Sequence, residues 1–202
     1  WRVFFGGLLF VILFLTAINF GLLGKMPSVQ ELENTNGTVF FDFLFDENNP
    51  TFHKINQPVF VNAVVTTCNQ LPENCIRING WNGFLERTTV EIATSKHQQF
   101  VEETMKTLGW NYQLVTDEPG MIAPRIIAMI VNEAYFGLAD GISTKEEIDV
   151  AMKLGTNYPF GPFEWSEKIG LEKIHHLLSV LNKQDSRYMP STLLQQTVLT
   201  IK

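Results

Sequence analysis

The sequence contains no concentration of basic residues and only two cysteines. Its 202 residues carry 15 Lys+Arg against 21 Asp+Glu, which gives a net charge of −6. Because it has no basic patch, the chain is not expected to bind nucleic acid. Cys68 and Cys75 are too few for a disulfide framework and their spacing fits no zinc motif, although a disulfide between them stays open. The four histidines are scattered along the chain, so no metal site is predicted.

Short catalytic signatures are also missing. The sequence has no Gly-x-Ser-x-Gly elbow, no P-loop and no His-Glu-x-x-His helix. A dinucleotide fingerprint, Gly-x-Gly-x-x-Gly between a strand and a helix, is absent as well. Gly6-Gly7 is the only candidate for it, and this pair continues into an apolar run. A complete dinucleotide site is therefore not predicted in this chain.

One long stretch lacks charge altogether. Residues 3–24 contain no charged side chain, are rich in Leu, Phe and Ile, and have a basic residue at each end. About 20 such residues span a bilayer core, and only Thr16 and Asn19 interrupt the apolar character. We therefore predict a transmembrane helix in residues 1–24. The alternative is a fully buried strand and helix of a soluble Rossmann-like domain.

A polar linker is predicted in residues 25–36, directly after the apolar run. The run and the segment that follows it read GLLGKMPSVQELEN at their junction. In this respect residues 1–35 resemble the membrane anchor and first extracellular residues of class A penicillin-binding proteins. The resemblance includes no catalytic motif. It implies contact with a membrane through residues 3–24.

From residue 37 onward the composition becomes that of an α/β domain. Runs of β-branched and aromatic residues alternate with turn residues, which predicts short strands. The predicted strands are residues 38–45, 58–65, 75–78, 88–92 and 110–116. Apolar residues recur at helical spacing between Ser95 and Leu108, which predicts a helix capped by Thr94. Residues 37–116 are thus expected to form a truncated, Rossmann-like α/β domain.

The remainder of the chain, residues 117–202, carries helical signals only. Apolar residues recur every three or four positions between turn residues such as Pro119-Gly120. The expected elements are, in order, a helix after Pro124 that ends at Gly141, a helix from the capping box Ser143–Glu146 to Gly155, a helix after the aromatic turn of residues 158–164, and helices on either side of Pro190. The predicted fold class is an α/β domain followed by an all-α domain, preceded by the transmembrane helix.

A larger set of residues in this helical part has a fixed spacing. They are Asp117, Pro119, Gly120, Arg125, Asn132-Glu133-Ala134, Ile148-Asp149, Ala151-Met152-Lys153-Leu154-Gly155, Tyr158-Pro159, Gly161-Pro162-Phe163-Glu164 and Ile169-Gly170-Leu171. With this spacing the segment resembles the start of the C-terminal helical domain of the 3-hydroxyacyl-CoA dehydrogenases. The resemblance implies a hydride transfer from the 3-hydroxyl carbon of an acyl-CoA to NAD. It also implies a homodimer formed through the helical domain.

The same resemblance indicates where the catalytic residues of the family fall. In the family a His removes the hydroxyl proton, and a Glu twelve residues later orients the imidazole. Aligning Trp81-Asn82 with the family motif His-Phe-Phe-Asn-Pro puts Asn79 at the His position and Glu91 at the Glu position. Gly83 stands where the motif has Pro. Because an amide has no titratable site near neutral pH, Asn79 is not expected to act as the base.

Further site positions depart from the family as well. The family has an Asn in the segment Pro-Gly-Phe-Ile-Val-Asn-Arg, and here that position is Pro124, which offers no side-chain amide. Contacts to the substrate are expected from Arg125 and from a hydroxyl, either Thr66 or Thr67. No cofactor is predicted for this chain. NAD would act only if the missing cofactor half were supplied elsewhere.

The leading hypothesis is therefore a degenerate 3-hydroxyacyl-CoA dehydrogenase-family protein that binds acyl-CoA or serves as a dimeric scaffold. One alternative is an active, NAD-dependent oxidoreductase of fatty-acid metabolism. Another is a membrane-anchored subunit or interaction module of a larger assembly. The predicted location is the membrane if residues 1–24 belong to the natural chain and the cytoplasm otherwise, since the two halves of the sequence indicate different compartments.

Overall fold

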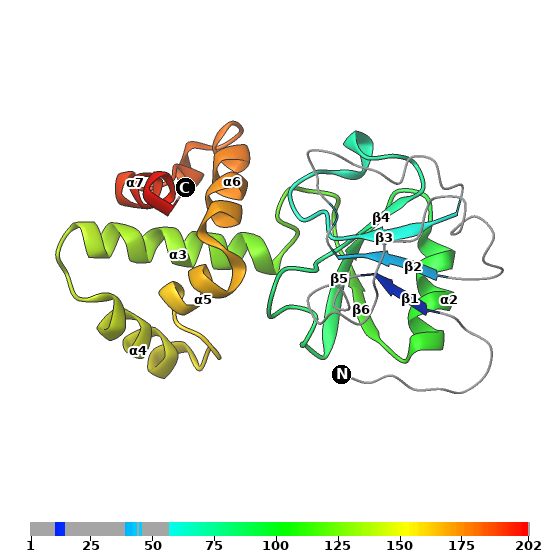
Figure 1. Cartoon of the computed structure of the whole chain (residues 1–202), viewed down its shortest axis with the longest axis horizontal. Coiled ribbons are helices and arrows are strands. Elements are labelled where there is room, and N and C mark those ends of the chain that lie inside the picture. Colours follow the sequence, from blue (N-terminus) through cyan, green and yellow to red (C-terminus); the bar gives the residue numbers. More distant parts are fainter. Residues whose placement is uncertain (1–10, 15–38, 44, 46–56, 202) are drawn as a thin grey trace. The chain divides into compact units, whose positions relative to one another are not determined.

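The chain folds into two compact units (Figure 1). The computed structural model describes residues 11–14, 39–43, 45 and 57–201. The first unit comprises the chain up to Gly80 together with Thr88–Asp117, and the second comprises the loop Trp81–Arg87 with the chain from Glu118 onward. The polypeptide therefore passes between the units at three places.

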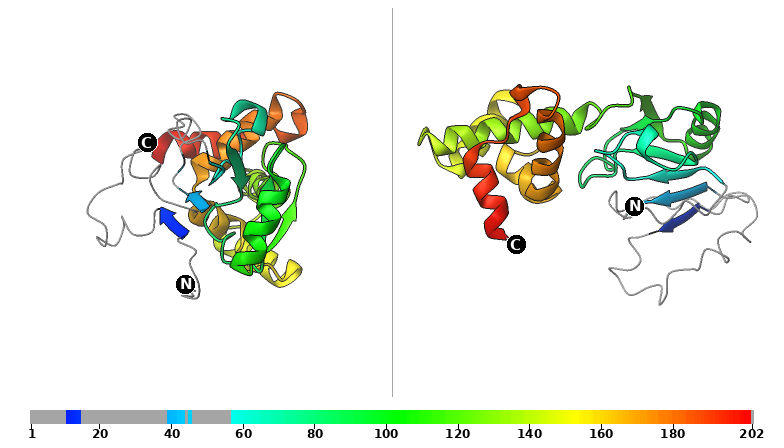
Figure 2. Two further views of the ribbon diagram at one scale, coloured as in Figure 1. Left: turned by 90° about the vertical axis from the view of Figure 1, so that its right-hand side faces the viewer. Right: turned by 90° about the horizontal axis from the view of Figure 1, so that it is seen from above.

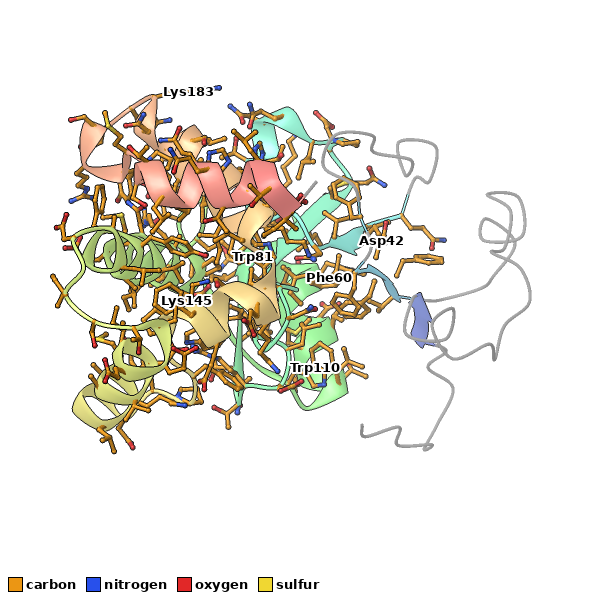
Figure 3. All side chains as sticks on the ribbon, turned by 60° about the vertical axis from the view of Figure 1, so that its left-hand side comes forward. Asp42, Phe60, Trp81, Trp110, Lys145 and Lys183 are labelled. Atoms are coloured by element: carbon orange, nitrogen blue, oxygen red, sulfur yellow. The ribbon has the colours of Figure 1, made fainter. Side chains whose placement is uncertain are left out.

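A six-stranded sheet forms the first unit. Its strands, which follow one another in space as in sequence, are β1 Val11–Phe14, β2 Val39–Asp42, β3 Val59–Val61, β4 Cys75–Ile78, β5 Thr89–Ala93 and β6 Asn111–Leu114. Strands β1 to β4 are parallel, β5 runs antiparallel to β4, and β6 is parallel to β5. The carboxyl ends of β2, β3 and β4 consequently lie at one edge of the sheet. Asp42 (labelled in Figure 3) ends β2 there, and Asn62 and Asn79 directly follow β3 and β4.

The central strands are buried along their whole length. All residues of β2 and β3 are buried, as expected for parallel strands that are covered on both faces. Phe41 and Phe60 stack across these strands with ring centroids 4.7 Å apart, and the ring of Trp110 lies 5.6 Å from that of Phe41. Phe60 and Trp110 are labelled in Figure 3. Helix α2, Gln98–Leu108, buries Val101 completely.

The apolar N-terminal run differs from its prediction. Val11–Phe14 lie in the middle of the predicted transmembrane helix of residues 1–24, yet they form β1 and pair in parallel with β2. The helix prediction is wrong for these four residues, because periodicity cannot distinguish a buried parallel strand from an apolar helix. The rest of that span and the linker of residues 25–36 lie outside the described residues. In the part of the chain that the structure describes, no helix is long and apolar enough to cross a bilayer.

The other predicted elements of the first unit are present, most of them with different bounds. Strand β4 has the predicted bounds, β5 is shifted by one residue, β3 and β6 are shorter at both ends, and β2 ends at Asp42 instead of residue 45. Helix α2 begins at Gln98 and not at Ser95, and His97 takes the N-cap position predicted for Thr94. The Thr94 hydroxyl still accepts a hydrogen bond from the His97 N–H (3.1 Å). The predicted N-cap of α2 and the observed one therefore lie three residues apart, in the same turn.

The second unit is helical (Figures 1 and 2). Its described helices are α3 Ala123–Ala139, α4 Lys145–Thr156, α5 Pro162–Ile169, α6 Leu171–Asn182, the short 3₁₀ helix Ser186–Tyr188 and α7 Thr192–Ile201. Their apolar faces meet in a core that includes Val131 of α3, Trp165 of α5 and Ile174 of α6, each at most 1% exposed. The sequence signals for these helices are confirmed.

The ends of α4 differ slightly from the prediction. Its N-cap is Thr144, whose hydroxyl accepts from the Glu147 N–H while the Glu147 carboxylate accepts from the Thr144 N–H. This capping box lies one residue beyond the predicted box Ser143–Glu146, and the Ser143 hydroxyl donates to the same carboxylate. The helix continues past Gly155 and ends at Thr156, and the C-cap Asn157 takes the left-handed conformation (φ +56°).

Candidate active site

Asn79 and Glu91 face each other across β4 and β5. The antiparallel register pairs Ile78 with Ile92, so the next opposed pair is residue 79 with residue 91. The Asn79 N–H donates to the Glu91 carbonyl (3.0 Å). Their side chains also meet, because Asn79 Nδ2 donates to Glu91 Oε2 at 3.2 Å. Asn79 is only 2% exposed and Glu91 is half-buried.

The structure therefore brings together the two residues that the sequence alignment placed in the catalytic positions. A base and an orienting carboxylate need this kind of hydrogen-bonded contact. Here the carboxylate is present and its partner is an amide. An amide donates and accepts hydrogen bonds but does not take up a proton near neutral pH. Residue 79 therefore offers no group that takes up a proton near neutral pH.

Asn62 holds the backbone on the other side of Asn79, a role that the sequence analysis missed. Its Oδ1 accepts from the Gly80 N–H (2.9 Å), and its Nδ2 donates to the Phe43 carbonyl (3.3 Å). A Cβ at Gly80 would lie 2.8 Å from the Asn62 side chain, so only glycine fits there without a shift. A polar residue directly after a buried strand was the available signal. Its two partners are distant in sequence and could not be read from it.

The loop after Gly80 explains the departure from the family's proline. Gly83 has φ +91°, which a proline ring, fixed near −65°, cannot adopt. A Cβ at Gly83 would also lie 2.8 Å from Cε of Lys168 and 3.1 Å from the ring of Trp165. This glycine therefore belongs to a loop conformation different from one that carries proline at the same position.

A second polar cluster of the first unit surrounds Arg77, which has no exposed surface. Its guanidinium donates to the Ala63 carbonyl (2.9 Å) and the Val64 carbonyl (2.8 Å) and forms an ion pair with Asp117 (2.5 Å). Both carboxylate oxygens of Asp117 accept from the Cys68 N–H at 3.0 Å. The cluster thereby joins β4, the segment after β3 and the last residue of the first unit.

The electrostatics of this cluster follow from its burial. Burial opposes ionisation of Asp117, but its hydrogen bonds from Cys68 and Arg77 and the guanidinium charge outweigh burial and lower its pKa below the ordinary value. Burial, with a smaller contribution from Asp117, raises the pKa of the Cys68 thiol to about 12. Cys68 and Cys75 are both free thiols, so the disulfide left open by the sequence is not formed.

The predicted substrate contacts have local partners in the structure. Thr67 is the N-cap of the 3₁₀ helix Cys68–Gln70, and its hydroxyl hydrogen-bonds Asn69. Thr66 lies beside it, half-buried. In the second unit, the Arg125 guanidinium pairs with the Glu118 carboxylate at 2.6 Å. A substrate contact at these three residues stays a prediction.

Pro124 lies in the first turn of α3 and is buried. Proline is tolerated at this position because the first N–H groups of a helix have no partner within the helix. An amide side chain is absent there, as the sequence indicated. The proline therefore shapes the start of the helix, and its side chain has no hydrogen-bonding group.

A nicotinamide dinucleotide would bind outside the carboxyl ends of the parallel strands, with its pyrophosphate at a Gly-rich turn that opens a helix. Among the described residues this edge carries Asp42, Asn62 and Asn79, and no Gly-rich turn leading into a helix follows β3 or β4. Gly6-Gly7, the only candidate in the sequence, lies outside the described ranges.

Comparison with known proteins identifies the helical part. Residues 120–201 match the family model of the 3-hydroxyacyl-CoA dehydrogenase C-terminal domain. A 3-hydroxyadipyl-CoA dehydrogenase from Escherichia coli is 38% identical over 109 residues, which cover 53% of this chain and 22% of the relative. The helical domain belongs to the 3-hydroxyacyl-CoA dehydrogenase family. A 3-hydroxybutyryl-CoA dehydrogenase from Clostridioides difficile is 41% identical over 86 residues, 42% of this chain and 31% of that protein. The chain thus spans a third or less of these two relatives.

Solved structures of 3-hydroxyacyl-CoA dehydrogenases have the same architecture. A 3-hydroxybutyryl-CoA dehydrogenase from Escherichia coli superposes with a TM-score of 0.62 at 29% identity, over 73% of this chain and 33% of that one. An (S)-3-hydroxybutyryl-CoA dehydrogenase from Ralstonia eutropha gives a TM-score of 0.69 at 24% identity, over 91% of this chain and 76% of that one. The second comparison shows a shared fold that extends over both units.

Several residues that carry the resemblance to the 3-hydroxyacyl-CoA dehydrogenases have architectural roles. Asp149 accepts hydrogen bonds from the N–H groups of Phe163 (2.8 Å) and Glu164 (3.2 Å) and so caps α5 from α4. A Cβ at Gly161 would lie 2.3 Å from the Asp149 carboxylate. Buried Asn132 joins α3 to the segment before α7 through the Met189 carbonyl (2.9 Å) and the Ser191 N–H (2.8 Å). These residues support the fold of the helical domain and do not by themselves imply catalysis.

Proposed function

We propose that this chain is a 3-hydroxyacyl-CoA dehydrogenase-family protein that binds an acyl-CoA ester and lacks both its own catalytic base and its own NAD site. The observation that carries the proposal is the contact between Asn79 Nδ2 and Glu91 Oε2 at 3.2 Å. The pair retains the contact that a base–orienter pair needs, while the titratable group is replaced by an amide. A function that needs binding and no proton transfer is consistent with this change.

Glu91 and Asn79 have different roles in the proposed binding of an acyl-CoA ester. Glu91 accepts a hydrogen bond from Asn79 and keeps the amide in one orientation. The amide group of Asn79 is suited to hydrogen-bond the 3-oxygen of an acyl chain but not to remove its proton. General bases typically contribute about 10²–10⁴-fold to a rate. Their loss leaves binding intact and removes most of the turnover.

The test is calorimetry on the full chain with acetoacetyl-CoA and with NADH, each titrated separately, followed by an assay of NADH oxidation with both present. We expect heat from acetoacetyl-CoA, none from NADH, and no oxidation. Coenzyme A without an acyl group is the control that separates recognition of the acyl chain from recognition of the nucleotide. NADH oxidation at a catalytic rate would contradict the proposal and favour the active-enzyme alternative. If acetoacetyl-CoA gives no heat of binding, the proposal is contradicted and an interaction module is favoured.

A dimeric scaffold is the second candidate, and the surface of the helical unit favours it. Helices α3 and α4 and the turn between them expose large apolar side chains. They are Ile126 (48% exposed), Phe136 (40%), Ile142 (74%), Val150 (52%) and Leu154 (82%). Apolar side chains exposed on consecutive elements are typical of an interaction surface. We propose that a second copy of the chain covers them, as the family resemblance implies.

Leu154→Glu is expected to shift the protein from dimer to monomer in sedimentation velocity, because a carboxylate placed in an apolar interface costs several kcal/mol when it is left unpaired. The matched control is Met189→Glu. Met189 is 55% exposed and lies before α7; its backbone carbonyl accepts from Asn132 of α3, but its side chain is not one of the exposed apolar side chains of α3 and α4 named above. A dimer that withstands Leu154→Glu, or equal dissociation by both variants, would contradict an interface on α4.

A further inference from the structure

The loop Trp81–Arg87 lies in sequence between the two members of the Asn79–Glu91 pair and belongs to the second unit. The chain leaves the first unit after Gly80, packs within the helical unit, and returns at Thr88. Asn79 is therefore two residues before the loop, and Glu91 is two residues inside the strand that follows it. Asn79 and Glu91, which belong to the first unit, are therefore each connected through a short stretch of backbone to a loop that belongs to the second unit.

The loop is closely packed within the helical unit. The buried ring of Phe84 stacks on that of Trp165 in α5, with centroids 5.4 Å apart and planes 25° apart. The Arg87 guanidinium lies 4.7 Å from the centre of the Phe84 ring and 5.8 Å from that of Trp165. Trp165 is 1% exposed and Phe84 is 3% exposed. Aromatic stacking and cation–π contacts at a buried tryptophan make this a firm attachment.

The backbone of the loop is also limited in how far it can extend. Two successive turns shorten it, since the Phe84 N–H donates to the Trp81 carbonyl (3.0 Å) and the Arg87 N–H donates to the Phe84 carbonyl (3.2 Å). On the side of the first unit, the Gly80 N–H is held by Asn62 Oδ1 at 2.9 Å. A residue spans at most about 3.6 Å of extended chain. A displacement of the loop of more than a few ångström must therefore move the backbone at Asn79 or at the start of β5.

We propose that the Trp81–Arg87 loop is a tether through which the helical unit sets the geometry of the Asn79–Glu91 pair, with Phe84, Arg87 and Trp165 as positioning residues. These residues act through the backbone on either side of the loop. The helical domain then controls whether Asn79 Nδ2 and Glu91 Oε2 are within hydrogen-bond reach. This inference does not rest on acyl-CoA binding, because the geometry of the pair can be observed without a ligand.

The test is backbone amide hydrogen exchange of the full chain, read at the Asn79 N–H, which donates to the Glu91 carbonyl. Phe84→Leu removes the stack on Trp165. Phe163→Leu is its matched control, because Phe163 is similarly buried (4% exposed) in the same unit and pairs its ring with that of Tyr135 at 5.2 Å. We expect Phe84→Leu to accelerate exchange at Asn79 by about fivefold or more. Phe163→Leu should leave that rate unchanged.

Arg87→Gln serves as a second variant that does not disturb the core, since Arg87 is exposed. It should accelerate exchange at Asn79 in the same direction, by about two- to threefold. The amide of Phe60 in β3 reports on the stability of the first unit and should not change in any variant. The proposal is contradicted if Phe84→Leu and Phe163→Leu accelerate amide exchange at Asn79 equally, or if neither Phe84→Leu nor Arg87→Gln accelerates it. It is also contradicted if exchange at the Phe60 amide accelerates in parallel with exchange at Asn79. Should Phe84→Leu fail to fold, Arg87→Gln decides by the same comparison.

Discussion

Replacing Asp117 with asparagine is expected to lower the free energy of unfolding by about 2–4 kcal/mol. Arg77 has no exposed surface, and its guanidinium forms an ion pair with the Asp117 carboxylate at 2.5 Å. Asparagine at residue 117 removes the negative charge of this ion pair from beside a buried guanidinium, which is costlier than the loss of one hydrogen bond. The expected value is at the lower part of the usual range because the Asp117 side chain is 32% exposed and water compensates in part.

Urea denaturation of the two proteins side by side measures this difference. Glu118→Gln is the matched control. Glu118 is the next residue in sequence, and its carboxylate also pairs with an arginine, Arg125, at 2.6 Å, but the two side chains are 49% and 29% exposed. Such an exposed pair is worth at most about 1 kcal/mol. Equal losses in both variants would show that the burial of Arg77 is not what makes its ion pair important.

The stability supplied by Asp117 should also depend on pH. Its pKa is lower in the folded protein than in the unfolded chain, because its hydrogen bonds from Cys68 and Arg77 and the guanidinium charge outweigh the effect of burial. As the pH falls, the unfolded chain therefore takes up this proton first. The contribution is fully present above the ordinary carboxyl pKa of about 4 and is lost as the pH falls through the lowered value. The difference between the native protein and Asp117→Asn should accordingly shrink below about pH 4.

Features of this fold that depend on neighbouring residues could be read from the sequence. Strand β4 has the predicted bounds, and α5 begins at Pro162, within the aromatic turn of residues 158–164 that was predicted to open it. The reason is that turn residues, helix caps and apolar periodicity act over a few positions. The antiparallel register of β4 and β5 was not predicted, yet the family spacing of twelve residues already placed Asn79 opposite Glu91.

Features that depend on distant residues could not be predicted. Arg77 interrupts an otherwise apolar strand, and nothing near it in sequence reveals that its partner Asp117 lies 40 residues away. The partners of Asn62, which are Phe43 and Gly80, are 19 and 18 residues away. The error at β1 has the opposite origin. Its local apolar pattern is strong but fits both a buried strand and a helix, and only pairing with β2 distinguishes the two.

Asn79→His is expected to create an imidazole whose pKa lies about one unit or more above the ordinary value of about 6.5. The physical reason is the Glu91 carboxylate, which now accepts a hydrogen bond from the Asn79 amide at 3.2 Å and would face the charged ring instead. An opposite charge at this distance favours the protonated imidazole. The ring protons of the new histidine report the titration by NMR, in comparison with the spectrum of the native chain.

Glu91→Gln combined with Asn79→His is the control, because it keeps a hydrogen-bonding side chain at residue 91 and removes the charge. The raised pKa should then fall to the ordinary value of about 6.5 or below it, because residue 79 is buried and burial opposes the charged imidazole. An unshifted imidazole in the single variant would mean that Glu91 does not orient a base in this fold. If the pair titrates as expected and the variant still does not oxidise NADH with acetoacetyl-CoA, the missing function lies in the cofactor half. If oxidation appears, the amide at residue 79 was the decisive loss, and the proposed absence of an NAD site is wrong.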